Sequence, residues 1–201
     1  APMEQPGIRM GKKAYASLGP ELGKRGIARH VGVPIAGFTP NGVDFADGST
    51  VAADLVMFIP AGTAHPVLAG SGLATTPAGF LDIDDGCRVT GTTNVYAVGD
   101  SAAMAGPDWR AKQGHMAEVM GRVAARNILS AHLGDGASHS YLAEVSLVCL
   151  MDVGNGANLI YRKPGKEGMI RLPLIGHWAK RAWGWYSAAT KLRRFPRLPG
   201  L

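Results

Sequence analysis

Short apolar runs separated by glycine-containing turns occupy the first quarter of the chain. A helix is expected over 14–25, with Gly26 as its stop. The dipeptides Asn41-Gly42 and Asp47-Gly48 fall between apolar runs and favour tight turns. Strands are expected at the apolar runs on either side of these turns, 35–38, 43–45 and 50–51, and at an earlier run, 27–31. The pattern therefore predicts a short helix followed by short strands joined by tight turns.

Two later runs are apolar on both faces. The run 55–59 stops at Pro60, as a buried strand would, and 94–98 is predicted to be a second strand of this kind. A short strand is expected at 80–83. Between them, 61–79 is rich in Gly, Ala, Pro and Thr, which is typical of a crossing between two subdomains.

A long amphipathic helix is predicted over about 112–133, ending at Gly134. Its apolar positions recur at helical spacing: Met116, Val119, Met120, Val123, Ala124 and Ile128. Strands over 144–151 and 158–161 follow, joined through Gly154-Asn155-Gly156.

Composition narrows the class of protein. The 201 residues are 46% hydrophobic and 18% charged, which is too apolar for a disordered chain and sufficient for a hydrophobic core. No apolar run approaches the roughly 20 residues needed to span a bilayer. Two cysteines exclude a disulfide-dense scaffold, and neither they nor the six scattered histidines have zinc-site spacing. No metal site is expected.

Basic charge and tryptophan gather at the end of the chain. Residues 162–201 hold 10 of the 21 Lys and Arg against Glu167 alone, and three of the four Trp. On a helix starting near Ile175, one set of apolar side chains shares a face: Trp178, Ala182, Trp185, Ala189 and Leu192. The basic residues lie opposite or beyond: Lys180, Lys191, Arg193, Arg194 and Arg197.

This composition fits a helix lying in the plane of an anionic membrane surface, or a helix packing on its own core or on a second subunit. Both alternatives stay open. No nucleic-acid-binding module is present, so no nucleic-acid partner is expected.

The pair Gly99-Asp100 carries the first candidate chemistry. A glycine at the end of a buried strand lets a ligand approach the backbone, and Asp100 would lie at the sheet edge where α/β folds bind ligands. Its carboxylate could accept hydrogen bonds from ribose or ribityl hydroxyls, beside a helix N-terminus with free N–H groups. The alternative is an ordinary strand-to-turn exit.

The run 90–100 resembles the second FAD-binding motif of the pyridine nucleotide-disulfide oxidoreductase superfamily. Segments 43–48 and 53–60 are similar to the closing half of its NAD-type domain, and 71–84 to the return into its FAD domain. The resemblance implies an α/β fold, part of a glutathione reductase-like flavoprotein with two dinucleotide-binding domains, and a small C-terminal α+β region.

This resemblance also implies a division of the chain. Residues 1–62 would close the NAD-type domain, and 63–136 would form the C-terminal part of the FAD-binding domain. Residues 137–201 would form a strand pair and the basic amphipathic tail.

Within that superfamily, the chain is most similar to sulfide:quinone oxidoreductases and flavocytochrome sulfide dehydrogenases. The run Ala111-Lys112-Gln113-Gly114 resembles their flavin-facing helix. The resemblance implies FAD as the cofactor, with Lys112 in the first helical turn stabilising the reduced flavin. The implied cofactor-binding residues are Gly99, Asp100, Lys112, Gln113 and Gly114.

Cys149, within 147–154, resembles the C-terminal redox cysteine of these enzymes, which passes electrons from sulfur to the flavin. Its alternative role is buried packing in a strand. Cys87 matches no redox position and is interpreted as structural. His65 and His115 could relay protons near a quinone, or be ordinary surface or core residues.

The resemblance predicts part of an FAD-dependent enzyme, peripheral to a membrane, that passes electrons from sulfide through Cys149 to a quinone. A type II NADH:quinone dehydrogenase and a non-catalytic scaffold or dimerisation remnant are the alternatives, and self-association stays open. No G-x-G-x-x-G motif, the first FAD fingerprint of the family, occurs in these 201 residues. The chain by itself is therefore expected to bind FAD weakly or not at all and not to turn over.

Overall fold

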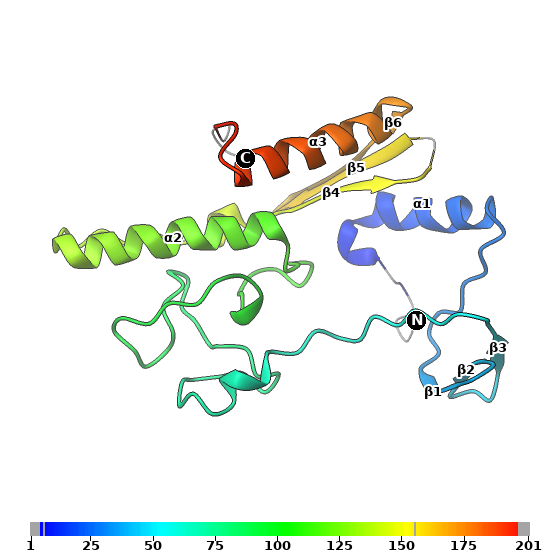
Figure 1. Ribbon diagram of the computed structural model, residues 1–201, viewed down its shortest axis with the longest axis horizontal. Coiled ribbons are helices and arrows are strands. Elements are labelled where there is room, and N and C mark those ends of the chain that lie inside the picture. Colours follow the sequence, from blue (N-terminus) through cyan, green and yellow to red (C-terminus); the bar gives the residue numbers. More distant parts are fainter. Residues whose placement is uncertain (1–4, 6, 155, 197–201) are drawn as a thin grey trace.

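A computed structural model describes residues 5, 7–154 and 156–196; Asn155 of the expected turn and Arg197 of the basic tail lie outside them. The described residues form three α-helices and two separate three-stranded antiparallel sheets (Figure 1). A long extended segment leads from the first sheet to the middle of the chain, which is built largely of loops around one helix.

The first part follows the predicted order. Helix α1 (Lys12–Gly23) is followed by a meander of β1 (Ile35–Thr39), β2 (Gly42–Phe45) and β3 (Thr50–Ala52). Both predicted tight turns are present between these strands. The prediction of a strand at 27–31 is wrong, because that segment has no ladder partner among the described residues and its side chains are largely exposed.

The prediction of a buried strand at 55–59 is also wrong. The side chains of Met57 and Ile59 are 87% and 92% exposed. A strand that is apolar on both faces needs partner strands at its edges and cover above and below. No strand of the described residues pairs with this segment, so its apolar character produces no burial.

The segments 80–83 and 94–98 do not form regular strands either. Each makes only isolated bridges to other parts of the chain, such as Leu81 with Ala102 and Tyr96 with Arg88. Their inward side chains are nevertheless buried and form the first core with the helix α2 (Gly114–Leu133). Local hydrophobicity therefore predicted burial correctly and the strand ladder wrongly.

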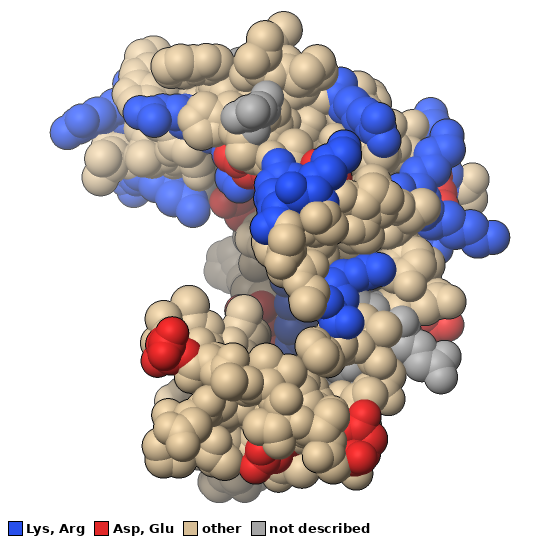
Figure 2. All heavy atoms as spheres, turned by 90° about the vertical axis from the view of Figure 1, so that its right-hand side faces the viewer, with Lys and Arg blue, Asp and Glu red and all other residues tan. Residues whose placement is uncertain are grey.

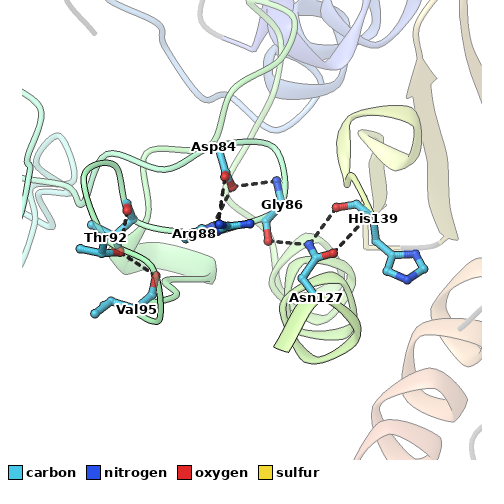
Figure 3. A network of polar contacts seen from close by, with 8 residues as sticks. Asp84, Gly86, Arg88, Thr92, Val95, Asn127 and His139 are labelled. Atoms are coloured by element: carbon cyan, nitrogen blue, oxygen red, sulfur yellow. Dashed lines mark hydrogen bonds and ion pairs between the residues drawn. The ribbon is translucent and has the colours of Figure 1, made fainter. Parts of the chain in front are cut away.

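One buried side chain ties this loop-rich region to α2 (Figure 3). The Asn127 Nδ2 group donates hydrogen bonds to the carbonyl oxygens of Gly86 (3.0 Å) and His139 (2.9 Å), and its Oδ1 accepts one from the His139 N–H (2.8 Å). The Asp84 carboxylate folds the same turn by accepting bonds from the Gly86 and Arg88 N–H groups. The next residue of α2, Ile128, was predicted to be on the buried face but is 50% exposed.

The second sheet consists of β4 (Leu147–Asp152), β5 (Gly156–Lys163) and β6 (Lys166–Pro173), in that order. The first two strands were predicted. The third was missed, although Pro164-Gly165 marks the turn before it.

Helices cover both faces of this sheet (Figure 1). The side of β4 that carries Leu147, Cys149 and Met151 packs in a second core with Ala14 of α1. The opposite face is covered by α3 (Ile175–Lys191), where Gly176 lies so close that an added Cβ would be 2.5 Å from the Ala157 nitrogen.

The predicted faces of the terminal helix are partly correct. Trp178 and Trp185 are 68% and 64% exposed, and Leu192 is exposed as well. Ala189, predicted to share their face, is buried instead. The division of the chain at 62 and 136 stays a prediction.

Candidate functional site at the start of helix α2

The loop that contains Gly99 and Asp100 lies against the first turns of α2. Gly99 begins a short 3-10 helix, Gly99–Ser101, with a φ of 63°, in the left-handed region that favours glycine. A Cβ on Gly99 would come within 3.2 Å of the Ala117 Cβ. The Asp100 side chain is exposed at this position.

Lys112 holds this loop in place. Its ammonium donates hydrogen bonds to the carbonyl oxygens of Asp100 (2.7 Å) and Ala102 (2.8 Å), and it lies 3.4 Å from the centroid of the Phe80 ring. Desolvation lowers the pKa of Lys112, and the charge of Asp100 opposes that shift. The prediction that Lys112 lies in the first helical turn is wrong, because α2 begins at Gly114 and Lys112 precedes its N-cap.

Gln113 is the N-cap residue, and its side chain does not cap the helix. Its Nε2 group donates to the Val148 carbonyl oxygen of β4 (3.2 Å). Its Oε1 atom is buried and has no hydrogen-bond partner among the described residues. The first turn of α2 contains no acidic residue, so the helix presents its free N–H groups and the positive end of its dipole here.

His115, in this first turn, contacts the residue before β4. Its Nε2 lies 3.2 Å from the Ser146 carbonyl oxygen and 3.3 Å from the Ser146 Oγ. Burial lowers the pKa of His115, against smaller opposing effects of the Ser146 hydrogen bond and of Glu118. This contact was not predicted from the sequence, since no local signal links residues 31 positions apart.

Cys149 lies on β4, one residue after the Gln113 contact. Its side chain is partly buried in the second core, in which Trp109 and Ala111 also pack. Hence the structure brings together the Gly99-Asp100 loop, Lys112, Gln113, Gly114 and the strand of Cys149.

Cys87, interpreted as structural, and His65, a candidate proton relay, make other contacts. Cys87 is fully buried with its Sγ 3.6 Å from the Met120 carbonyl oxygen, and burial raises its pKa to about 12. A thiol in this state is a packing group. The His65 Nδ1 accepts a hydrogen bond from the Val67 N–H and so caps the short helix Pro66–Leu68.

Trp109 is a residue of this region that the sequence did not single out. It packs against both hydrophobic cores, and the Arg162 guanidinium lies 5.2 Å from its ring centroid. Trp109 therefore joins the loop region to the second sheet, three residues before Lys112. The sequence drew attention to the three tryptophans near its C-terminus, and Trp109 stands apart from them.

Among the residues that the structure describes, no three His, Cys, Asp or Glu side chains gather where they could hold a metal ion. No helix in this part of the chain combines the length and the apolarity needed to cross a membrane.

A family model, described as pyridine nucleotide-disulphide oxidoreductase, matches residues 3–124, more than half of the chain. The chain belongs to this family. Its match ends within α2, so it includes the Gly99-Asp100 loop, Lys112 and Gln113 but not Cys149.

Solved structures extend the likeness of this pyridine nucleotide-disulphide oxidoreductase beyond residue 124. The chain is similar to the sulfide:quinone oxidoreductase from the hyperthermophilic bacterium Aquifex aeolicus, with a TM-score of 0.80 at 20% identity, over 92% of this chain and 47% of that one. It is also similar to a NAD-dependent persulfide reductase from A. fulgidus, with a TM-score of 0.59 at 18% identity, over 80% of this chain and 30% of that one.

The chain thus spans about half of the first of these structures and less than a third of the second. At these identities the likeness concerns the fold. The predicted fold class, part of a flavoprotein-type α/β architecture, is confirmed.

Proposed function

We propose that this chain is part of an FAD-dependent oxidoreductase that passes electrons from sulfide, through Cys149 and the flavin, to a quinone. One observation carries the proposal: Gln113 at the start of α2 is hydrogen-bonded to β4 beside Cys149, so a sulfur group and a candidate flavin-binding helix end are adjacent. The fold similarity to a sulfide:quinone oxidoreductase supports the same assignment.

The residues at this helix end fit a flavin. The free N–H groups of the first turn would stabilise the negative charge that develops on the flavin ring when it is reduced. The buried Gln113 Oε1 is an acceptor without a partner and would take an N–H or O–H group of the ligand. Its orientation is fixed, because the Val148 carbonyl can only accept and therefore holds the Nε2 side of the amide.

The chain's own residues have separate tasks in this proposal. The exposed Asp100 carboxylate would accept hydrogen bonds from ribityl hydroxyls. Lys112 uses two of its three donors to hold the Asp100 and Ala102 carbonyls, so it would position that loop and add positive charge nearby. Cys149 would bind the sulfur of the donor. When bound, FAD would act as a two-electron acceptor and pass these electrons on to a quinone.

The experiment measures sulfide-dependent reduction of a soluble ubiquinone analogue. It uses the 201-residue chain with added FAD and, in parallel, a polypeptide that also carries the first FAD fingerprint. The chain alone is expected to stay colourless after gel filtration with FAD and to be inactive, since these 201 residues contain no G-x-G-x-x-G. A yellow chain would refute that part of the proposal.

In the longer polypeptide, Cys149→Ser should abolish sulfide-dependent quinone reduction and leave the bound flavin in place. Cys87→Ser is the matched control and should retain activity, because the buried Cys87 is a packing group. Full sulfide-dependent activity in Cys149→Ser would overturn the proposed electron path. NADH-dependent quinone reduction by the longer polypeptide with Cys149 intact, without sulfide oxidation, would favour the type II NADH:quinone dehydrogenase.

For localisation, we propose that the exposed face of α3 rests on an anionic membrane surface. Trp178 and Trp185 lie on it, and the Arg181 guanidinium lies 5.8 Å from the Trp178 ring centroid. On the face shown in Figure 2, Lys and Arg gather over the part that contains this helix, the second sheet and α1, while the lower part is mostly uncharged with a few acidic residues. Exposed tryptophans on a basic helix favour the interfacial region of a bilayer, where a lipid-soluble quinone would be within reach.

Co-sedimentation with phosphatidylserine-containing vesicles tests this face. The double variant Trp178→Gln/Trp185→Gln should lose binding. The double variant Met57→Gln/Ile59→Gln should not, because that exposed apolar pair lies in the segment 55–59, which contains no Lys or Arg. Equal binding by both variants would remove the membrane proposal. Loss of self-association in the tryptophan variant, without any vesicle binding by the wild type, would assign the face to a second copy.

A further inference from the structure

Strand β4 is an edge strand whose free edge is held by the start of α2. It pairs with β5 on one side only. On the other side, Gln113 donates to the Val148 carbonyl (3.2 Å), and the His115 Nε2 lies 3.2 Å from the Ser146 carbonyl. Carbonyl groups two residues apart on an extended chain point the same way, so these two contacts hold one edge.

The contact at Ser146 defines the state of the His115 ring. A carbonyl oxygen only accepts hydrogen bonds, so a hydrogen bond to it requires the proton of the neutral ring on Nε2, and the Ser146 Oγ can then act as a second acceptor. The ring is partly buried and lies at the positive end of the α2 dipole, and both conditions disfavour a charged imidazolium.

Ser146 lies where the chain passes from one core to the other. Val145 is buried in the first core, and Leu147 is buried in the second. Cys149 follows on the same side of β4 as Leu147. A hydrogen bond from His115 to Ser146 therefore links α2 to the chain at the point where the two cores meet, directly before the strand of Cys149.

We propose that His115 is a positioning residue that, through Ser146, holds the Cys149 strand against the N-terminal end of α2. The value of this alignment to the enzyme rests on the proposed function, in which the Cys149 sulfur must meet a flavin at this helix end. A displacement of the order of 1 Å between reacting groups can slow such a step about a hundredfold.

The test uses the 201-residue chain without any flavin and measures alkylation of each cysteine by iodoacetamide, resolved by mass spectrometry. In His115→Ala, the Cys149 rate should rise about fivefold, the equivalent of about 1 kcal/mol for one lost hydrogen bond. Cys87 is an internal control, because it is fully buried and reacts only when the core opens. His115→Gln, which keeps an N–H donor, should restore a rate close to that of the wild type.

Ser146→Ala is the matched variant. It removes the hydroxyl contact and retains the carbonyl acceptor, so Cys149 should stay protected. An unchanged Cys149 rate in His115→Ala would overturn the proposal. So would equal deprotection in His115→Ala and His115→Gln with Cys87 still protected, because the role would then need the ring and not the donor.

A measurement on the wild type remains decisive if His115→Ala unfolds and both cysteines react. Long-range ¹H–¹⁵N spectra at neutral pH should report the Nε2–H tautomer of His115; the Nδ1–H tautomer or a charged ring would refute the proposal. None of these readouts involves FAD. Failure of the chain to bind flavin would therefore leave the inference about His115 tested on its own terms.

Discussion

Replacing Asn127 with alanine tests the packing of α2 against the loop region. The side chain makes three hydrogen bonds of 2.8–3.0 Å to the main chain at Gly86 and His139, from a position that is 7% exposed. Its loss leaves two carbonyl groups and one N–H without partners. A typical buried hydrogen bond contributes about 1 kcal/mol net, and a group left unpaired costs more, so a loss of roughly 3 kcal/mol in the free energy of unfolding is expected.

That loss is a large share of the stability of an ordinary domain, about 5–15 kcal/mol. For a protein of this length, 3 kcal/mol corresponds to a decrease in Tm of roughly 6–12 °C. The assay is urea unfolding followed by far-UV circular dichroism, with thermal unfolding as a second measure.

The matched control is the neighbouring Ile128→Ala. Ile128 is half exposed, and alanine has the higher helix propensity, so the cost should stay well below 1 kcal/mol. Helical periodicity alone predicts the opposite ranking, with Ile128 in the core. A larger loss in Ile128→Ala than in Asn127→Ala would therefore refute the orientation of α2 derived from the structure.

Three further predictions concern pH, a long-range helix cap and a close approach. Because the pKa of His115 is lowered in the folded state, the unfolded chain binds the proton first as the pH falls, and stability should decrease below the ordinary pKa of 6.5. Urea midpoints measured from neutral pH to about pH 5 should therefore decline less in His115→Gln than in the wild type. The Glu167 carboxylate accepts a hydrogen bond from the first N–H of α1 and forms an ion pair with Arg162. Glu167→Gln should therefore lower the free energy of unfolding by about 1 kcal/mol, and by less in high salt. An unchanged urea midpoint at low salt would contradict this. A Cβ on Gly42 would lie 2.0 Å from the Val51 carbonyl oxygen, whereas a Cβ on Gly37 would meet nothing within 4 Å. Gly42→Ala should therefore lower the Tm far more than Gly37→Ala. Similar Tm values in the two variants would refute the close approach of Gly42 to Val51.

The sequence by itself determined the features that depend on neighbouring residues. The Asn41-Gly42 and Asp47-Gly48 turns, the left-handed Gly134 that ends α2 and the buried stripe that begins at Met116 all follow from local backbone preference and helical period. Local preference also placed Cys149 in a strand.

Only the tertiary structure decided which of these elements meet. The exposed 55–59 segment is as apolar as a buried strand, but it has no partner strand among the described residues. The contacts of Gln113 with Val148 and of His115 with Ser146 join residues more than 30 positions apart. Hydrogen bonds and burial of this kind depend on where distant backbone comes to lie, and periodicity or turn chemistry, which act over a few residues, hold no information about that position.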